Sequence, residues 1–285
     1  LPWLAVFFGG MWLPNLFYWG LNQFITQRTL GARSIEEGQK GVLFGATLKL
    51  IIPFIVIFPG ILAFELYADE ITNPDQAFPV LISKLLPAGL VGAMLAALFG
   101  AVMSTLDSLL NSAATIFTID IYRPFLNPAA DSARVVRVGK ITTLVLVVLA
   151  CLWAPVVATH EKGLYLFIQQ YWGFLQSGVV AAFFLGLLWD KVPAGAAFWG
   201  MVLNFPVYGF LLWLNPPDEF PFLHNMALTF AVVVLFMVVY TLLRPLHTPR
   251  TLPERNPTPY RTTPLVKYWS IALCIATLAL YMIFF

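Results

Sequence analysis

Five polar side chains recur along one apolar stretch of the sequence, between residues 100 and 120. They follow one another at intervals of four, three, four and three residues: Ser104, Ser108, Asn111, Thr115 and Thr118. At 100° per residue, this spacing places all five on one face of a helix. Hydroxyl and amide oxygens can coordinate a hard cation or hydrogen-bond a polar solute, so this face could bind either.

Two interpretations of this polar stripe are open. An unpaired hydroxyl or carboxylate is costly in hydrocarbon, so the stripe should face protein, water or an ion. Serine and threonine also let neighbouring helices approach closely, and helix packing alone would explain the hydroxyls. Two charges at membrane depth, Asp107 beside the stripe and Lys49 in another segment, favour a transport pathway, because such charges mark functional sites.

The composition identifies an integral membrane protein. The chain has 285 residues, of which 60% are hydrophobic and 11% charged, with a mean hydropathy of +0.82. A soluble domain carries about 25% charged residues. We therefore expect an all-α, polytopic membrane protein. The two cysteines, Cys151 and Cys274, lie in separate apolar segments and suggest neither a disulfide framework nor a metal site.

Eight hydrophobic segments approach or exceed the roughly 20 residues that a spanning helix needs. They lie at roughly 2–24, 41–66, 87–119, 138–159, 163–188, 193–214, 222–243 and 265–285. Thirteen of the 16 lysines and arginines fall in the connections after the first, third, fifth and seventh segments or within three residues of them. The positive-inside rule places these connections in the cytoplasm. The sequence thus predicts about eight transmembrane helices, embedded in the lipid of the cell (inner) membrane.

The first segment contains residues that interrupt helices. Within FFGGMWLPNLFYWG, Pro14 removes a backbone donor, and glycines such as Gly20 let the chain leave helical geometry. Interrupted helices are typical of secondary transporters, although a kinked packing helix is the alternative. Asn15, Tyr18 and Trp19 follow the proline. Amides can bond sugar hydroxyls and a ring can stack on a sugar, but aromatic residues also anchor segment ends at the interface.

Two more segments carry polar groups at membrane depth. Lys49 lies about two turns inside the second segment, where snorkelling to the interface and a binding role are equally reasonable. The fifth segment contains Gln169 and Gln176 seven residues apart on one face, with Gly173 and Gly178 permitting a bend. No nucleophile–base pair and no phosphate-binding glycine loop is evident, so we expect neither an enzyme nor an ATP-driven pump.

Three separated motifs give the chain a recognisable resemblance. NLFYWGLNQFITQRTLGA, TLKLIIPF and STLDSLLNSAATIFTIDIYRPF resemble the sodium/solute symporter family, and within it most of all the bacterial sodium/galactose and sodium/glucose symporters. The resemblance runs in order over nearly the whole chain. It implies a leucine-transporter-like fold of inverted five-helix repeats, with the substrate site at their interface.

The resemblance also implies where this chain lies in that fold. Residues 1–190 would form the second five-helix repeat with a broken first helix, starting at the sixth core helix. Residues 191–285 would form three peripheral helices, with a proline-rich cytoplasmic linker at 244–264. The first repeat is absent from this sequence, so we expect the N-terminal half of the same transporter as a partner and do not expect this polypeptide to transport alone.

Residue roles follow from the same resemblance. Asn15, Lys49 and Gln169 match family positions that hydrogen-bond the sugar. Tyr18 matches the aromatic residue that stacks beneath the sugar and closes its inner exit.

The sodium ligands implied by the resemblance lie on the third segment. The family positions that bind sodium match three residues here: Ala101, which would bind through its backbone carbonyl, Ser104 and Thr105. Asp107 stands where the most similar relatives have a small residue, which leaves an additional cation interaction open.

The implied function is sodium-coupled symport of a sugar of the galactose or glucose type by alternating access. Sodium ion and a small-molecule sugar are the expected ligands, with no nucleic acid and no catalytic residue. One alternative is symport of another solute, such as myo-inositol, a carboxylate or a nucleoside. Another is a membrane domain that senses a solute without moving it.

Overall fold

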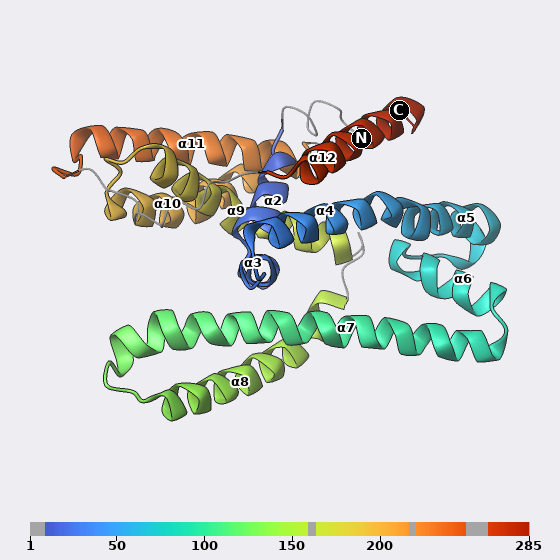
Figure 1. The fold of residues 1–285 in the computed structure, drawn as a ribbon. Coiled ribbons are helices and arrows are strands. Elements are labelled where there is room, and N and C mark those ends of the chain that lie inside the picture. The colour runs from blue at the N-terminus through green and yellow to red at the C-terminus, as the bar shows by residue number, and fades with distance from the viewer. Residues whose placement is uncertain (1–8, 159–163, 217–219, 249–261, 285) are drawn as a thin grey trace. The chain divides into compact units, whose positions relative to one another are not determined.

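The computed structural model describes residues 9–158, 164–216, 220–248 and 262–284, and this part of the chain is helical without a strand (Figure 1). The expected all-α fold is confirmed. In chain order, the elements are α2 (Trp12–Leu16), η1 (Phe17–Leu21), α3 (Gln23–Leu30), α4 (Ile35–Ile52), η2 (Pro53–Ile57), α5 (Phe58–Tyr67), η3 (Ala68–Glu70), η4 (Pro74–Gln76), α6 (Ala77–Leu85), α7 (Ala88–Ile116), η5 (Phe117–Leu126), α8 (Ser132–Ala158), α9 (Leu164–Leu188), α10 (Ala194–Leu214), α11 (Phe222–Leu243) and α12 (Pro264–Phe284).

Seven helical segments in the described chain are long and apolar enough to cross a membrane. They are Ile35–Glu70, Ala88–Leu126, Ser132–Val157, Leu164–Leu188, Ala194–Leu214, Phe222–Leu243 and Pro264–Ile283. These coincide with seven of the eight predicted segments, which confirms a polytopic membrane protein. The remaining segment, the first, contains the short pieces α2 and η1 and the start of α3, and its residues 2–8 lie outside the described chain.

The chain folds into two compact units, each built from separated stretches of sequence. Unit 1 comprises Leu1–Thr26 and Tyr165–Arg261; unit 2 comprises Gln27–Leu164 and Thr262–Phe285. The division at residue 190 into a repeat and peripheral helices stays a prediction. Most of the proposed linker, 249–261, lies outside the described residues.

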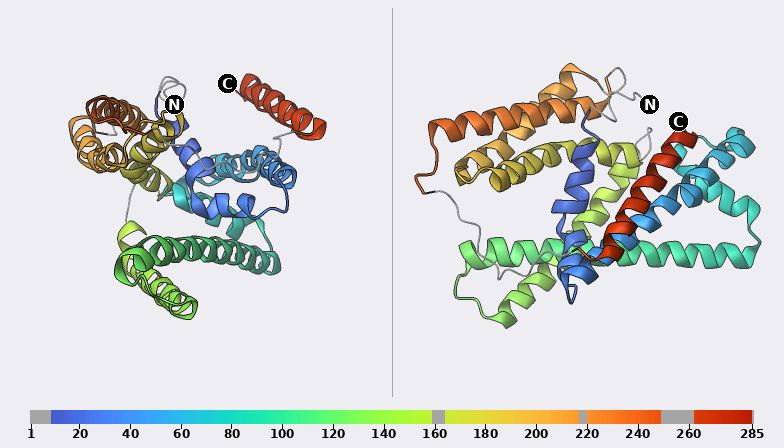
Figure 2. Two further views of the ribbon diagram at one scale, coloured as in Figure 1. Left: turned by 60° about the vertical axis from the view of Figure 1, so that its left-hand side comes forward. Right: turned by 45° about the horizontal axis from the view of Figure 1, so that its top comes forward.

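Unit 1 packs α2, α9, α10 and α11 around a buried apolar cluster (Figures 1 and 2). Leu13, Val180, Tyr208 and Met226 form its centre and are fully buried. The N–H of Gly10 donates to the Leu223 carbonyl at 2.8 Å, which ties the start of the first segment to α11. A β-carbon at this position would lie 2.5 Å from that same oxygen, so only glycine fits.

Glycines on α9 let α10 approach closely. An ideal β-carbon at Gly173 would lie 2.3 Å from the Tyr208 ring, and one at Gly178 would lie 2.9 Å from the Asn204 β-carbon. The helix α9 runs without interruption from Leu164 to Leu188. The two glycines therefore serve close helix packing, and a bend at these positions stays a prediction.

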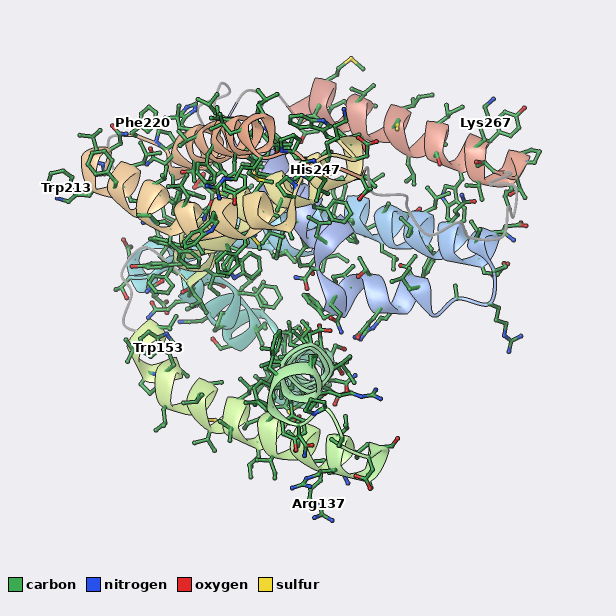
Figure 3. All side chains as sticks on the ribbon, turned by 90° about the vertical axis from the view of Figure 1, so that its left-hand side faces the viewer. Arg137, Trp153, Trp213, Phe220, His247 and Lys267 are labelled. Carbon is green, nitrogen blue, oxygen red and sulfur yellow. The ribbon has the colours of Figure 1, made fainter. Side chains whose placement is uncertain are left out.

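In unit 2, α8 turns back along η5 and α7 (Figures 1 and 2). Arg137 and Trp153 lie at opposite ends of α8 (Figure 3). Thr118 is only 4% exposed, and its γ-methyl lies 3.7 Å from the position of a β-carbon on Gly139 of α8. Its hydroxyl donates to the Ala114 carbonyl at 2.8 Å. This end of the polar stripe thus serves helix packing.

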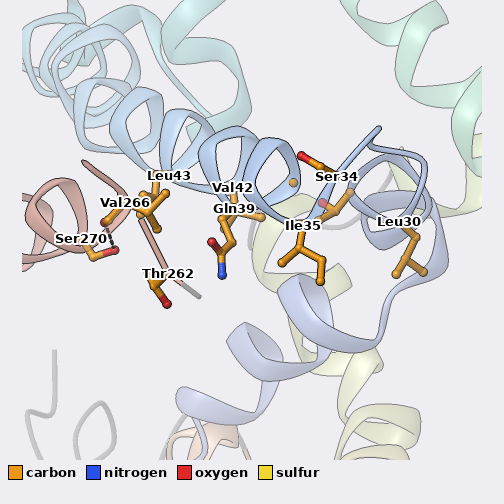
Figure 4. Close-up of a pocket in the computed structure, with 11 residues that line it drawn as sticks. Leu30, Ser34, Ile35, Gln39, Val42, Leu43, Thr262, Val266 and Ser270 are labelled. Atoms are coloured by element: carbon orange, nitrogen blue, oxygen red, sulfur yellow. Dashed lines mark hydrogen bonds between the residues drawn. The ribbon is translucent and has the colours of Figure 1, made fainter. Parts of the chain in front are cut away.

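The last helix, α12, packs on α4 in the same unit. The indole N–H of Trp269 donates to the Thr47 hydroxyl at 3.0 Å. An open pocket of about 480 Å³ is lined by residues of α3, α4 and α12 (Figure 4). Its polar lining includes Ser34, Gln39 and Ser270. The contact gives α4, the helix that carries Lys49, a fixed neighbour.

Candidate functional site

The first segment leaves helical geometry at Asn22. The π-helix η1 continues α2 as far as Leu21, Asn22 adopts an extended conformation with φ −79° and ψ 117°, and α3 begins at the next residue. The Asn22 carbonyl accepts the backbone N–H of Thr26 at 3.0 Å and so starts α3. Pro14 does not break the helix, because it lies in the first turn of α2, where a backbone N–H has no partner within the helix.

Asn15 and Tyr18 lie just before this break, on α2 and η1. Asn15 is exposed, and its amide nitrogen donates to the Met11 carbonyl at 2.8 Å. The half-buried ring of Tyr18 meets Trp19 and Phe24 edge-on, with centroid distances of 5.4 and 5.7 Å. These contacts fix the plane of the tyrosine ring next to the interruption.

Gln169 lies near the start of α9. Its amide nitrogen donates to the Tyr165 hydroxyl at 2.9 Å. Its amide oxygen is buried and has no hydrogen-bond partner among the described residues. Because α2 and η1 pack on α9 through Leu13 and Phe17, three of the four predicted sugar-binding residues lie on elements that contact one another within unit 1.

Lys49, the fourth predicted sugar-binding residue, belongs to unit 2. It is exposed in the last turn of α4. It lines a pocket of about 550 Å³ together with Pro53 of η2 and Tyr281 of α12. Its membership of one site with Asn15, Tyr18 and Gln169 stays a prediction.

The predicted sodium ligands share one face of α7 in unit 2. Ala101, Ser104 and Thr105 are all exposed. The Thr105 hydroxyl oxygen lies 3.0 Å from the Ala101 carbonyl oxygen, to which it donates. Two adjacent oxygen ligands around a hard cation are separated by roughly 3.4 Å when each lies about 2.4 Å from the ion. The donor set, all neutral oxygen, suits a hard cation such as sodium in its chemistry. The 3.0 Å separation is that of a helical threonine hydrogen bond, so the sodium site stays a prediction.

Two residues connect this oxygen face to α3, the helix that follows the break in the first segment. Ser108 is 8% exposed, and its hydroxyl donates to the Ser104 carbonyl at 3.1 Å. The same hydroxyl oxygen accepts a hydrogen bond from the guanidinium of Arg28 on α3. The sequence pattern identified Ser108 as part of the stripe, but no signal connected it to Arg28, which lies 80 positions away.

Asp107 stands apart from this network. It is exposed on α7 and forms no ion pair with the other described residues. The described chain also contains no group of three or more histidines, cysteines or acids that could hold a metal ion. An additional cation interaction of Asp107 stays a hypothesis.

Comparison with known proteins gives consistent matches. The model of the sodium:solute symporter family matches residues 1–204. The sodium/glucose cotransporter of Vibrio parahaemolyticus is 40% identical over 253 residues, which cover 82% of this chain and 46% of the relative. The uncharacterized symporter YidK of Escherichia coli is 36% identical over 274 residues, which cover 96% of this chain and 48% of that relative. Sodium/myo-inositol cotransporter 2 of Oryctolagus cuniculus is 35% identical over 277 residues; the match covers 85% of this chain and 41% of that relative.

These relatives agree on the class of protein. All three are named as symporters or cotransporters, and none as an enzyme. This chain spans somewhat less than half the length of each of them.

Proposed function

Because this chain belongs to the sodium:solute symporter family, we propose that it is part of a sodium-coupled symporter for a ring-shaped polyol, either a hexose or an inositol. In this proposal, the transporting protein is as long as the relatives, and its N-terminal half supplies the first repeat. The transporter lies in the cell membrane, with the basic connections in the cytoplasm.

The observation that carries this proposal is the match of the family model to residues 1–204, a stretch that contains the predicted sodium ligands of α7. The Ala101 carbonyl and the Thr105 hydroxyl lie 3.0 Å apart on an exposed face, in a stretch that the family model matches. A hard cation prefers such neutral and anionic oxygens over nitrogen or sulfur ligands. Sodium bound there, with ligands from the N-terminal half, is the coupling ion.

The residues next to the interrupted first segment support a polyol as the solute. Asn15 and Gln169 offer neutral amides, which can both donate to and accept from hydroxyl groups. The edge-packed ring of Tyr18 offers an apolar face against which a sugar or inositol ring stacks. A carboxylate solute would use Lys49 but would gain little from two amides and a ring. Among the relatives, one is named for glucose and another for myo-inositol, and both solutes are rings with several hydroxyl groups.

Coupling requires that sodium and solute each bind the outward-open and inward-open states with different affinities. Sodium at α7 favours the outward-open state, the solute then binds, and both are released inward together. The interruption at Asn22 separates α2 and η1, which carry Asn15 and Tyr18, from α3.

The test is solute uptake by the full-length protein in proteoliposomes. Labelled glucose, galactose and myo-inositol are each supplied with an inward sodium gradient, and with the same gradient of potassium as the control. The proposal expects uptake of at least one of them to depend on the sodium gradient and to be inhibited by the others in excess.

Two results would contradict the proposal in different ways. Sodium-driven uptake that carboxylates or nucleosides inhibit, and polyols do not, would keep the coupling ion and overturn the solute. Binding of a polyol without uptake under any sodium gradient would favour a sensor over a transporter.

A further inference from the structure

The side chain of Arg28 reaches from α3 to α7 within unit 2. Its guanidinium donates to the hydroxyl of Ser108, which is 8% exposed. This side-chain hydrogen bond joins α3 to the helix of the predicted sodium ligands. The contact therefore links the element that follows the helix break to the cation face.

Ser108 connects this guanidinium to the cation face. Its hydroxyl donates to the Ser104 carbonyl at 3.1 Å. Ser104 is itself a predicted sodium ligand. Thr105 is the next residue along α7, and Ala101, whose carbonyl accepts the Thr105 hydroxyl, lies one turn earlier. Ser108, which holds the guanidinium of Arg28, thus lies three to seven residues beyond the predicted ligands, or about 5 to 10 Å along the helix axis.

The charge of Arg28 is permanent and has no acidic partner in the described chain. A guanidinium cannot lose its proton in a protein. The three ion pairs of the described residues, Lys40 with Glu36, Lys40 with Glu37 and Lys84 with Glu70, do not include it. Asp107, the acid adjacent to Ser108 in sequence, is exposed and does not pair with it. Two like charges at this separation repel, and the repulsion grows where solvent is excluded.

We propose that Arg28 sets the sodium affinity of this site by acting through Ser108, as a positioning residue and not as a ligand. With its guanidinium on Ser108, sodium binding at Ala101, Ser104 and Thr105 is weakened. Sodium binding and the Arg28–Ser108 contact therefore oppose each other, and the contact belongs to the state that releases sodium. This inference rests on the proposed sodium coupling and adds the group that lowers the affinity.

The experiment measures the sodium concentration that gives half-maximal polyol uptake by the full-length protein in proteoliposomes. Equilibrium binding of radioactive sodium to the purified protein provides a second readout that does not require transport. The variants are Arg28→Gln, Arg28→Lys, Ser108→Ala and the Arg28→Gln/Ser108→Ala pair. Arg33→Gln is the matched control, since Arg33 is an exposed arginine in the connection that follows α3.

Arg28→Gln should lower the half-maximal sodium concentration by about threefold or more, because it removes the repelling charge. Arg28→Lys should stay within about twofold of the wild type, since the charge is kept. Ser108→Ala should shift the value in the same direction as Arg28→Gln, because it releases the guanidinium. The double variant should show no further decrease beyond Arg28→Gln, since both changes break one contact. Arg33→Gln should have no effect.

The direction of the shift separates this role from a structural one. A purely structural role for Arg28 would raise the sodium requirement or reduce the amount of folded protein, so an unchanged or raised value in Arg28→Gln overturns the inference. A decrease in Arg28→Lys as large as that in Arg28→Gln also overturns it. If Arg28→Gln does not fold, Ser108→Ala decides: a lowered value supports the inference and an unchanged value overturns it. Sodium-independent uptake by the wild type would overturn the proposed coupling together with this inference. Sodium-dependent uptake by the wild type, with the same half-maximal sodium concentration in Arg28→Gln, would overturn the inference alone.

Discussion

Thr105 offers the sharpest test of the cation site at the scale of a single residue. Its hydroxyl lies 3.0 Å from the Ala101 carbonyl, and valine has the same shape without the oxygen. Thr105→Val should raise the sodium concentration for half-maximal uptake by about tenfold, which corresponds to a loss of about 1.4 kcal/mol of binding free energy. The maximal uptake rate at saturating sodium should change little. A sodium titration of uptake in proteoliposomes measures both values.

The same helix provides the control for this substitution. Thr115 also donates its hydroxyl to the carbonyl four residues earlier, that of Asn111, at 2.7 Å, but it lies outside the predicted ligand set. Thr115→Val should leave the sodium dependence unchanged. Equal effects of the two substitutions would mean that the loss of a hydroxyl weakens the helix, and that Thr105 is not a ligand.

Lys49 tests the solute side of the site. Lys49→Ala should raise the KM for the transported polyol by about tenfold, because a hydrogen bond from a charged donor contributes roughly 1.5–3 kcal/mol. The half-maximal sodium concentration should remain within about twofold of the wild type, since Lys49 does not lie on α7. Lys84→Ala is the control, because Lys84 forms an exposed ion pair with Glu70 at 2.8 Å. A raised sodium requirement in Lys49→Ala with an unchanged KM would contradict this assignment.

At this scale, a sequence motif can predict residues that lie within about one helical turn of one another, and the role of the α7 residues as sodium ligands stays a prediction. Ala101, Ser104 and Thr105 are close in sequence, so a motif can identify them together, and the structure brings Thr105 to the Ala101 carbonyl. Arg28 and Ser108 lie 80 positions apart. Helical periodicity carries no information about a contact between two separate helices, so this pair required the structure.

At the scale of the element, α9 shows how glycine determines helix packing. A β-carbon at Gly173 would lie 2.3 Å from the ring of Tyr208, which is fully buried and donates its hydroxyl to the Gln170 carbonyl at 2.8 Å. Gly173→Ala should therefore destabilise the protein by about 1–3 kcal/mol, the usual cost of overpacking a core. Thermal unfolding of the full-length protein in detergent, followed by tryptophan fluorescence, measures this change.

Gly186, on the same helix, is the matched control. A β-carbon at this position would meet no atom within 4 Å. Gly186→Ala should therefore be neutral or stabilise the helix by up to about 1 kcal/mol, because alanine loses less backbone entropy than glycine. A melting temperature for Gly173→Ala equal to that of Gly186→Ala would show that α9 and α10 do not pack as closely as described.

Hydropathy located the spanning elements well but not the irregular one. The candidate spans begin and end within a few residues of most predicted segments, because about 20 apolar residues are needed whatever the tertiary structure. The interruption of the first segment was expected near Pro14, but the extended residue is Asn22. A proline is compatible with the first turn of a helix, so its presence alone cannot locate a break.

At the scale of the whole molecule, each compact unit combines distant parts of the chain. The start of the sequence, Leu1–Thr26, joins Tyr165–Arg261, and the last helix joins Gln27–Leu164. Periodicity and charge bias report which face and which side of the membrane a segment occupies, but not its tertiary partners. This arrangement was therefore beyond the reach of the sequence, as was the contact between Trp269 of α12 and Thr47 of α4.

The division also places the predicted ligands in both units. Asn15, Tyr18 and Gln169 belong to unit 1, whereas Lys49 and the α7 oxygens belong to unit 2. Under the proposed function, solute and sodium must each favour the same rearrangement of the molecule, since coupling arises from differential affinity for its states. The movement of one ligand should then require the other.

Entry of radioactive sodium into proteoliposomes that contain the full-length protein tests this coupling most directly. Sodium entry is measured with and without an unlabelled polyol outside, at a fixed membrane potential. The proposed function predicts that the polyol accelerates sodium entry in the wild type, and that Thr105→Val at the same sodium concentration largely abolishes this acceleration. Sodium entry that is unchanged by a polyol which the protein binds would contradict symport.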